Sequence, residues 1–142
     1  MSQIRDQRRL AAPPEVVWQG LTTADGLLGW FWPPRLDPRI EVDPRVGGRY
    51  RIARPVAGMA VSGEYITVRP VERLEFGWHW DSEDVTSVVT VTLTPDFDGT
   101  MLVVEHDRLA SSEVENHIKG WSDCLDRLPD WLADWLAVRA EA

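Results

Sequence analysis

The sequence has few of the residues that cross-link a chain or bind a metal. Its 142 residues include one cysteine and three histidines. The single cysteine, Cys124, excludes an internal disulfide and favours a reducing, cytoplasmic setting. His79, His106 and His117 fall on separate predicted elements, with no pair four residues apart on one helix. We therefore expect no metal site, and we find no motif for any other cofactor.

Long hydrophobic runs and an excess of positive charge are also missing. No apolar stretch approaches the roughly 18 residues of a membrane-spanning helix. Residues 1–10 are too charged to contain the apolar core of a signal peptide. The formal net charge is −8, so the surface repels phosphate backbones and anionic lipids. We therefore expect neither nucleic acid nor a membrane as a partner.

Tryptophan, by contrast, is abundant. The chain has eight, of which Trp18 stands alone. The other seven form three groups: Trp30 and Trp32; Trp78 and Trp80; Trp121, Trp131 and Trp135. Large aromatic rings either fill a core or line a ligand cavity, and the sequence leaves both interpretations open.

Alternating apolar residues predict a series of strands in the middle of the chain. In residues 74–80, four side chains share one face: Leu74, Phe76, Trp78 and Trp80. Residues 85–94 and 101–106 repeat the pattern, and Asp98-Gly99 is a turn signal between them. Weaker strand signals lie at 39–42, 46–52 and 60–68, and residues 4–10 are predicted to form a first strand at a sheet edge.

Helices are predicted on either side of this series. Two short ones follow the first strand, with proline in the first turn of one and Thr22 or Thr23 capping the other. After the strands, Ser111 or Ser112 is expected to cap a long helix. Its apolar residues recur at intervals of three and four: Val114, Ile118, Trp121, Leu125, Leu128, Leu132 and Trp135. Pro129 is expected to kink or divide this helix near Leu128.

The order of these elements predicts one α+β domain over residues 1–142. Strands joined by short turns form an antiparallel meander, here of about six or seven strands. Such a sheet must cover its apolar face, and the long C-terminal helix is the element wide enough to do so. We therefore expect a curved sheet wrapped around that helix.

With this order of elements, the chain resembles the START-like superfamily, also called SRPBCC, which has a helix-grip fold. The closest resemblance is to the branch named for activators of the ninety-kilodalton heat-shock protein ATPase. It is carried by Ala12-Pro13-Pro14-Glu15-Val16-Val17-Trp18, Leu21-Thr22, Gly29-Trp30-Phe31, Val46-Gly47-Gly48-Arg49-Tyr50, Gly63-Glu64-Tyr65, and Trp121 with Cys124-Leu125-Asp126-Arg127-Leu128. The resemblance implies a cavity between sheet and helix. It also implies kinship with carriers of lipids, hormones and polyketides, and with a few cyclases and aromatases.

The candidate ligand-binding residues are those expected to face this cavity. They are Trp30, Trp32, Tyr65, Phe76, Trp78, Trp80, His106, His117, Trp121 and Leu125. His106 is in phase with Leu102 and Val104, so it faces the cavity and is a candidate general base or hydrogen-bond donor. His117, at the edge of the helical stripe, is a second candidate. Either histidine can instead be a satisfied structural residue.

Three functions follow as hypotheses. The first is a binding or carrier protein for a small hydrophobic molecule, aromatic ones included. The second is a cyclase- or aromatase-type enzyme in which His106 or His117 moves a proton. The third is a chaperone-interacting module, which rests on fold analogy. Any exposed part of Trp30-Phe31-Trp32 would serve as a lid or as the contact of a homodimer.

Overall fold

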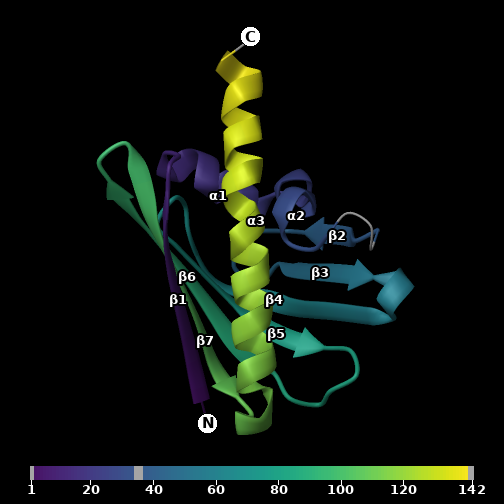
Figure 1. Cartoon of the computed structure of the whole chain (residues 1–142). Helices are drawn as coiled ribbons and strands as arrows, with labels where there is room; N and C mark the ends of the chain where they lie inside the picture. Colours follow the sequence, from purple (N-terminus) through teal and green to yellow (C-terminus); the bar gives the residue numbers. More distant parts are fainter. Residues whose placement is uncertain (1, 34–36, 141–142) are drawn as a thin grey trace.

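The computed structural model describes residues 2–33 and 37–140, which form a seven-stranded antiparallel sheet crossed by one long helix (Figure 1). The elements, in chain order, are β1 (Ser2–Leu10), α1 (Pro14–Thr22), α2 (Ala24–Trp30), β2 (Arg39–Val42), β3 (Arg49–Arg54), the 3₁₀ turn η2 (Pro55–Ala57), β4 (Met59–Arg69), β5 (Arg73–Trp80), β6 (Ser87–Asp96), β7 (Gly99–Leu109), the 3₁₀ turn η3 (Ser111–Glu113) and α3 (Val114–Ala140). The strand order is β1-β7-β6-β5-β4-β3-β2. The predicted α+β helix-grip fold is confirmed.

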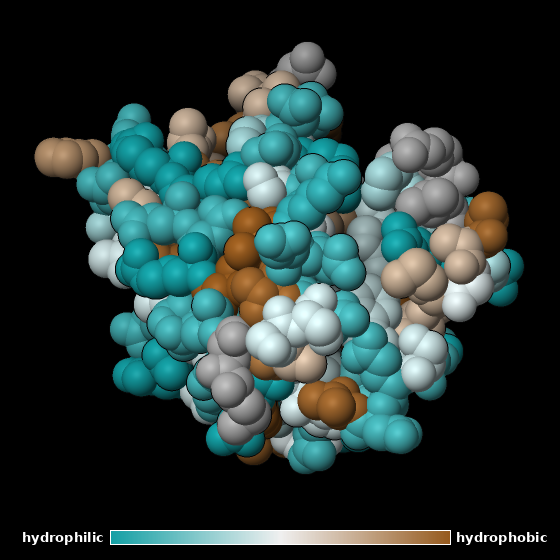
Figure 2. Space-filling model, turned by 60° about the horizontal axis from the view of Figure 1, so that its bottom comes forward, coloured by the Kyte–Doolittle hydropathy of each residue, from teal (hydrophilic) through white to brown (hydrophobic). Residues whose placement is uncertain are grey.

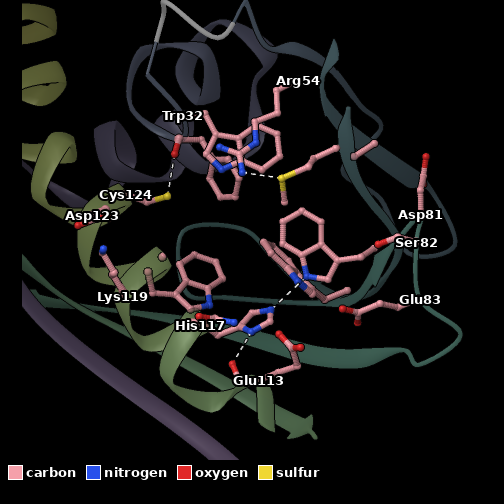
Figure 3. Close-up of a pocket in the computed structure, with 18 of the residues that line it drawn as sticks. Trp32, Arg54, Asp81, Ser82, Glu83, Glu113, His117, Lys119, Asp123 and Cys124 are labelled. Carbon is pink, nitrogen blue, oxygen red and sulfur yellow. Dashed lines mark hydrogen bonds between the residues drawn. The ribbon is translucent and has the colours of Figure 1, made fainter. Parts of the chain in front are cut away.

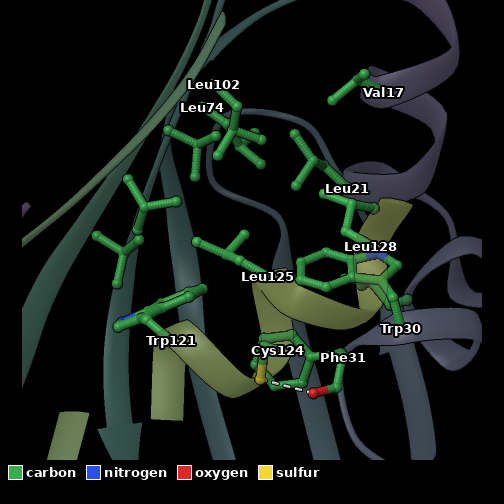
Figure 4. Close-up of a cluster of buried hydrophobic side chains, with 14 of the residues drawn as sticks. Val17, Leu21, Trp30, Phe31, Leu74, Leu102, Trp121, Cys124, Leu125 and Leu128 are labelled. Atoms are coloured by element: carbon green, nitrogen blue, oxygen red, sulfur yellow. Dashed lines mark hydrogen bonds between the residues drawn. The ribbon is translucent and has the colours of Figure 1, made fainter. Parts of the chain in front are cut away.

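The core lies between the inner face of the sheet and α3. Alternate residues of β7 point inward, and Leu102 and Val104 are almost completely buried. From the helix, Leu125 and Leu128 meet them and are equally buried. Figure 4 shows Leu125 directed toward Leu74 and Leu102 of the sheet. Burial of these side chains is the main force that holds helix and sheet together.

The two short helices close one end of this core. The Thr23 hydroxyl caps α2 by accepting a hydrogen bond from the amide of Gly26 at 2.9 Å, as one of the two predicted caps requires. The indole N–H of Trp30 donates to the carbonyl of Gly20 at 2.8 Å and so ties α2 to α1. Trp131 of α3 lies against Gly20 and Gly29, where an added Cβ would come within 2.9 and 2.0 Å of its ring. Trp131 is thus a packing residue.

The structure differs from the sequence expectations along α3. The helix continues through Pro129 as one element of 27 residues, because the packed residues on both sides of the proline hold it in place. Neither Ser111 nor Ser112 caps it, since η3 precedes α3 and has no side-chain cap. Ile118 is 48% exposed, whereas His117 is buried. The buried face therefore leaves out Ile118 but includes His117 and Cys124, which lie on a second line of residues expected to widen it.

The β6–β7 hairpin also differs in detail. Asp96 pairs with Gly99, so the two loop residues are Phe97 and Asp98. Phe97 has a positive φ of 56° and a fully exposed ring. Asp98-Gly99 does signal the hairpin, but the loop is shifted by one residue toward the N-terminus. Within residues 2–33 and 37–140, no helix combines the length and the apolar character needed to cross a membrane.

Candidate functional site

The space between sheet and helix is nearly filled by side chains. The cavity that remains there measures about 40 Å³, room for a water molecule or two but for no larger ligand. Its wall includes six of the predicted ligand-binding residues: Trp30, Tyr65, Phe76, Trp78, Trp121 and Leu125. Most of the predicted binding wall therefore packs together as core.

A much larger cavity of about 710 Å³ opens at the N-terminal end of α3. We call it the open cleft. It lies between the first half of α3, the segment after α2, and the strand ends around Arg54, Ala60 and Trp80. Figure 3 shows its side chains converging from these elements. The lining residues are Phe31, Trp32, Pro33, Arg54, Gly58, Met59, Ala60, Trp78, Trp80, Asp81, Ser82, Glu83, Glu113, Asn116, His117, Lys119, Gly120, Trp121, Asp123, Cys124 and Arg127.

Tryptophan rings form the apolar wall of the open cleft. Trp32 and Trp80 lie nearly parallel, with ring centroids 6.2 Å apart and 17° between their planes. Trp78 lies deeper, with its centroid 5.5 Å from that of Trp80 and 5.3 Å from that of Trp121. The indole N–H of Trp78 is buried and has no acceptor among the described residues. A flat apolar molecule would find stacking surface here.

The segment that carries Trp32 is held by α3. The guanidinium of Arg127 donates to the carbonyls of Trp30 and Phe31 at 3.0 and 2.8 Å. The Cys124 thiol donates to the same Phe31 carbonyl at 2.7 Å. These bonds satisfy carbonyls at the end of α2, and burial raises the pKa of Cys124 to about 12. The thiol is therefore a structural group, and it fixes one wall of the open cleft.

His106 lies behind this wall in a closed chain of hydrogen bonds. Its ring is 0% exposed. An indole N–H can only donate, so Trp121 donates to His106 Nδ1 at 3.0 Å. The proton is then on Nε2, which donates to the Ser87 hydroxyl at 2.7 Å, and that hydroxyl donates to the Trp78 carbonyl at 3.3 Å. Burial, with His117 as the lesser cause, lowers the pKa of His106 to about 3.

His117 makes a similar chain at the edge of the open cleft. Trp80 Nε1 donates to His117 Nε2 at 3.1 Å, and His117 Nδ1 donates to the Glu113 carbonyl at 2.8 Å. The His106 and His117 rings meet edge to face, with centroids 5.1 Å apart. Each histidine therefore orients one tryptophan of the wall. Neither has a free ring nitrogen for proton transfer, because both nitrogens of each ring are engaged.

The structure thus divides the predicted site residues into groups. Trp32, Trp78, Trp80, His117 and Trp121 line the open cleft, while Trp30, Tyr65, Phe76 and Leu125 face the small internal cavity. His106 supports the wall from behind. Trp30, Phe31 and Trp32 are 2%, 4% and 8% exposed, so they leave little surface for the lid or dimer contact considered above.

Arg54 is a lining residue that sequence reasoning missed. The strand around Tyr50 and Ile52 was expected to end at Ile52, but β3 continues to Arg54. Tyr50, Ile52 and Arg54 alternate on the inner face, so the period-two pattern, extended by one step, would have indicated an inward-facing arginine. Within residues 2–33 and 37–140, no three His, Cys, Asp or Glu side chains gather into a group able to hold a metal ion.

Comparison with known proteins agrees with this architecture. The model of the family described as "Activator of Hsp90 ATPase homolog 1-like protein" matches residues 11–133. No curated protein matches the chain. Among solved structures, protein CV1439 from Chromobacterium violaceum is 28% identical, with a TM-score of 0.80 over 92% of this chain and 96% of that one. Protein MLL2253 from Mesorhizobium loti is 26% identical, with a TM-score of 0.81 over 94% and 98%. PFC0360w, an HSP90 activator from Plasmodium falciparum, is 22% identical, with a TM-score of 0.75 over 94% and 97%, and shows the shared fold alone.

Proposed function

This chain belongs to the family of Activator of Hsp90 ATPase homolog 1-like proteins, and on that premise we propose that it binds a small, largely apolar, flat molecule in the open cleft. The observation that carries the proposal is the cavity of about 710 Å³ with four tryptophans in its wall: Trp32, Trp78, Trp80 and Trp121. Ligand sites are concave, mostly apolar and of this size. Binding here differs from the enclosed cavity expected from the sequence, because the ligand enters at the end of α3.

The polar groups of the open cleft support binding more than turnover. Both histidines hold tryptophan rings in place and have no free ring nitrogen. Aromatic rings held by hydrogen bonds lose little entropy when they stack on a ligand. A cyclase and a chaperone-interacting module are the alternatives, and no geometry in the cleft favours either.

Native mass spectrometry of the freshly purified protein tests the proposal directly. We expect a stoichiometric small molecule that is released on denaturation, and its mass defines the ligand class. The same spectrum gives the oligomeric state. An apo mass, together with no binding from a panel of flat apolar compounds, would contradict the proposal.

Gly120 offers a way to block the open cleft without disturbing the core. It lies on α3 in the cleft wall, and a Cβ added there meets nothing within 4 Å. We expect Gly120→Leu to reduce ligand affinity at least tenfold, because the new side chain occupies the cleft. The protein itself should keep or gain stability, since glycine inside a helix costs about 0.5–1 kcal/mol relative to residues that favour helices.

Isothermal titration calorimetry and urea unfolding of the Gly120→Leu variant separate these effects. Gly120→Ala is the matched control, because it gives the same gain in helix propensity and adds little volume. We expect the alanine variant to bind within about threefold of the wild type. Unchanged binding by the leucine variant would place the ligand elsewhere.

A further inference from the structure

The open cleft holds an arginine that has no anionic partner among the described residues, and we infer that Arg54 binds the carboxylate of an aromatic or otherwise apolar acid. The inference rests on the proposed function and specifies its ligand. Arg54 is the last residue of β3 and faces inward with Tyr50 and Ile52. In Figure 3 it lies beside Trp32, away from Glu113 and His117 at the other end of the cleft.

The contacts of Arg54 within the protein are weak ones for a cation. Its Nη2 donates to the thioether sulfur of Met59 at 2.8 Å, and a thioether is a poor acceptor. Its Nε is buried without a partner, and no carboxylate of the described residues lies within 4.0 Å of the guanidinium. Other arginines of the chain do find acids: Arg51, on the same strand, pairs with Asp81 through two bonds of 3.0 and 2.7 Å.

Trp32 orients the unpaired guanidinium. The Arg54 Cζ lies 4.5 Å from the centroid of the Trp32 ring. Stacking on an aromatic face fixes the plane of a guanidinium and leaves its N–H edge free for a planar acceptor such as a carboxylate. The same tryptophan lies nearly parallel to Trp80. A flat acid can therefore place its ring against the tryptophans and its carboxylate on Arg54 at the same time.

The charges around the open cleft favour a ligand with a single negative charge that lies next to Arg54. The open cleft is also lined by four acids, Asp81, Glu83, Glu113 and Asp123, and by two further cations, Lys119 and Arg127, and the whole chain has a net charge of −8. These acids repel anions from the rest of the cleft, whereas the Arg54 end attracts them. Arg127 already donates to the carbonyls of Trp30 and Phe31, so Arg54 is the less committed guanidinium, and a monoanion matches it better than a dianion such as a phosphate ester. A monocarboxylate is the group that matches a single stacked arginine.

Matched pairs of acid and amide test the inference by isothermal titration calorimetry. The probes are 2-naphthoate with 2-naphthamide, and indole-3-acetate with indole-3-acetamide, which have similar shapes but differ in charge. We expect the better acid to bind the wild type about tenfold more tightly than its amide, as a charge-assisted hydrogen bond provides. Arg54→Gln should remove this preference and leave the affinity for the amide within about threefold. Because Arg54 makes no ion pair in the described part of the chain, the variant is expected to fold.

Arg49→Gln is the control for charge alone. Arg49 lies on the same strand, on the outer face, and is exposed outside the cleft. The Arg49→Gln variant should keep the preference for the acid over the amide. Equal affinities for acid and amide in the wild type, or a preference that survives Arg54→Gln, would overturn the carboxylate site while leaving the proposed function intact. If no acid and no amide binds the wild type, the proposed function fails together with the inference.

Discussion

Replacing His106 with alanine is expected to lower the free energy of unfolding by about 3–5 kcal/mol at pH 7. The alanine removes the acceptor of the Trp121 indole N–H and the donor to the Ser87 hydroxyl, both of which are buried. A buried polar group left without its partner costs about 1–3 kcal/mol. The missing ring also leaves a cavity in the core. Urea unfolding of the two proteins measures the difference.

The same difference should depend on pH. The pKa of His106 is lowered to about 3 in the folded state, against about 6.5 in the unfolded chain. As the pH falls below about 6.5, His106 takes up a proton in the unfolded state but stays neutral in the folded state. The wild type therefore loses stability down to about pH 3. The variant lacks this titration. The gap between wild type and His106→Ala should therefore narrow by about 2 kcal/mol between pH 7 and pH 5.

His79→Ala is the control for this experiment. His79 is on β5 but only partly buried, and its removal should change stability by less than about 0.5 kcal/mol at pH 7. Where His106→Ala does not fold, His106→Gln keeps an acceptor for Trp121 and serves in its place. A gap that stays constant from pH 7 to pH 5 would show that the buried ring takes up its proton as readily as the unfolded chain does.

Gly63→Ala is expected to destabilise the protein by a similar amount, about 3–5 kcal/mol. Gly63 is on β4, where a Cβ would lie 1.9 Å from the carbonyl oxygen of Gly77 on β5. That oxygen also accepts a hydrogen bond from the hydroxyl of Tyr50 at 2.6 Å. The overlap is with backbone and with a buried ring, so no side chain can move aside to relieve it. Differential scanning calorimetry or urea unfolding gives the loss.

Gly77→Ala is the matched control for Gly63→Ala. Gly77 lies on the facing strand, yet its nearest contact with an added Cβ is the Thr86 methyl at 3.6 Å, an ordinary packing distance. We expect Gly77→Ala to stay within about 1 kcal/mol of the wild type. If both variants lose the same stability, the close approach at Gly63 is not responsible for the loss.

The fold was largely predictable because its signals are local and repeated. Alternation in 74–80 and 85–94, the Thr23 cap and the apolar spacing of α3 each report on a few neighbouring residues. Where these patterns predicted the structure wrongly, the error is also confined to a few residues. Pro129 was expected to kink or divide α3, and it does not divide it, because packing of Leu128 and Leu132 outweighs the loss of one backbone hydrogen bond.

The site was predictable only in part. Alternation placed Trp78, Trp80 and His106 on the inner face correctly, yet it does not distinguish a residue that lines a cavity from one that fills it. Trp121 touches both cavities, while Tyr65 and Phe76 touch only the small one. The difference depends on how rings from β3, β4, β5 and α3 fit together, which is a property of volumes in three dimensions.

The sequence by itself determined the order of the elements, the α+β helix-grip class and the faces on which most tryptophans lie, because periodicity and turn residues are written along the chain. The tertiary structure alone decided that the core closes and that the cleft opens at the end of α3. It also decided that His106 and His117 each accept an indole N–H, and that Arg54 has no acid partner within residues 2–33 and 37–140. These features depend on contacts between residues that are far apart in the chain, and such contacts cannot be predicted from a local sequence pattern.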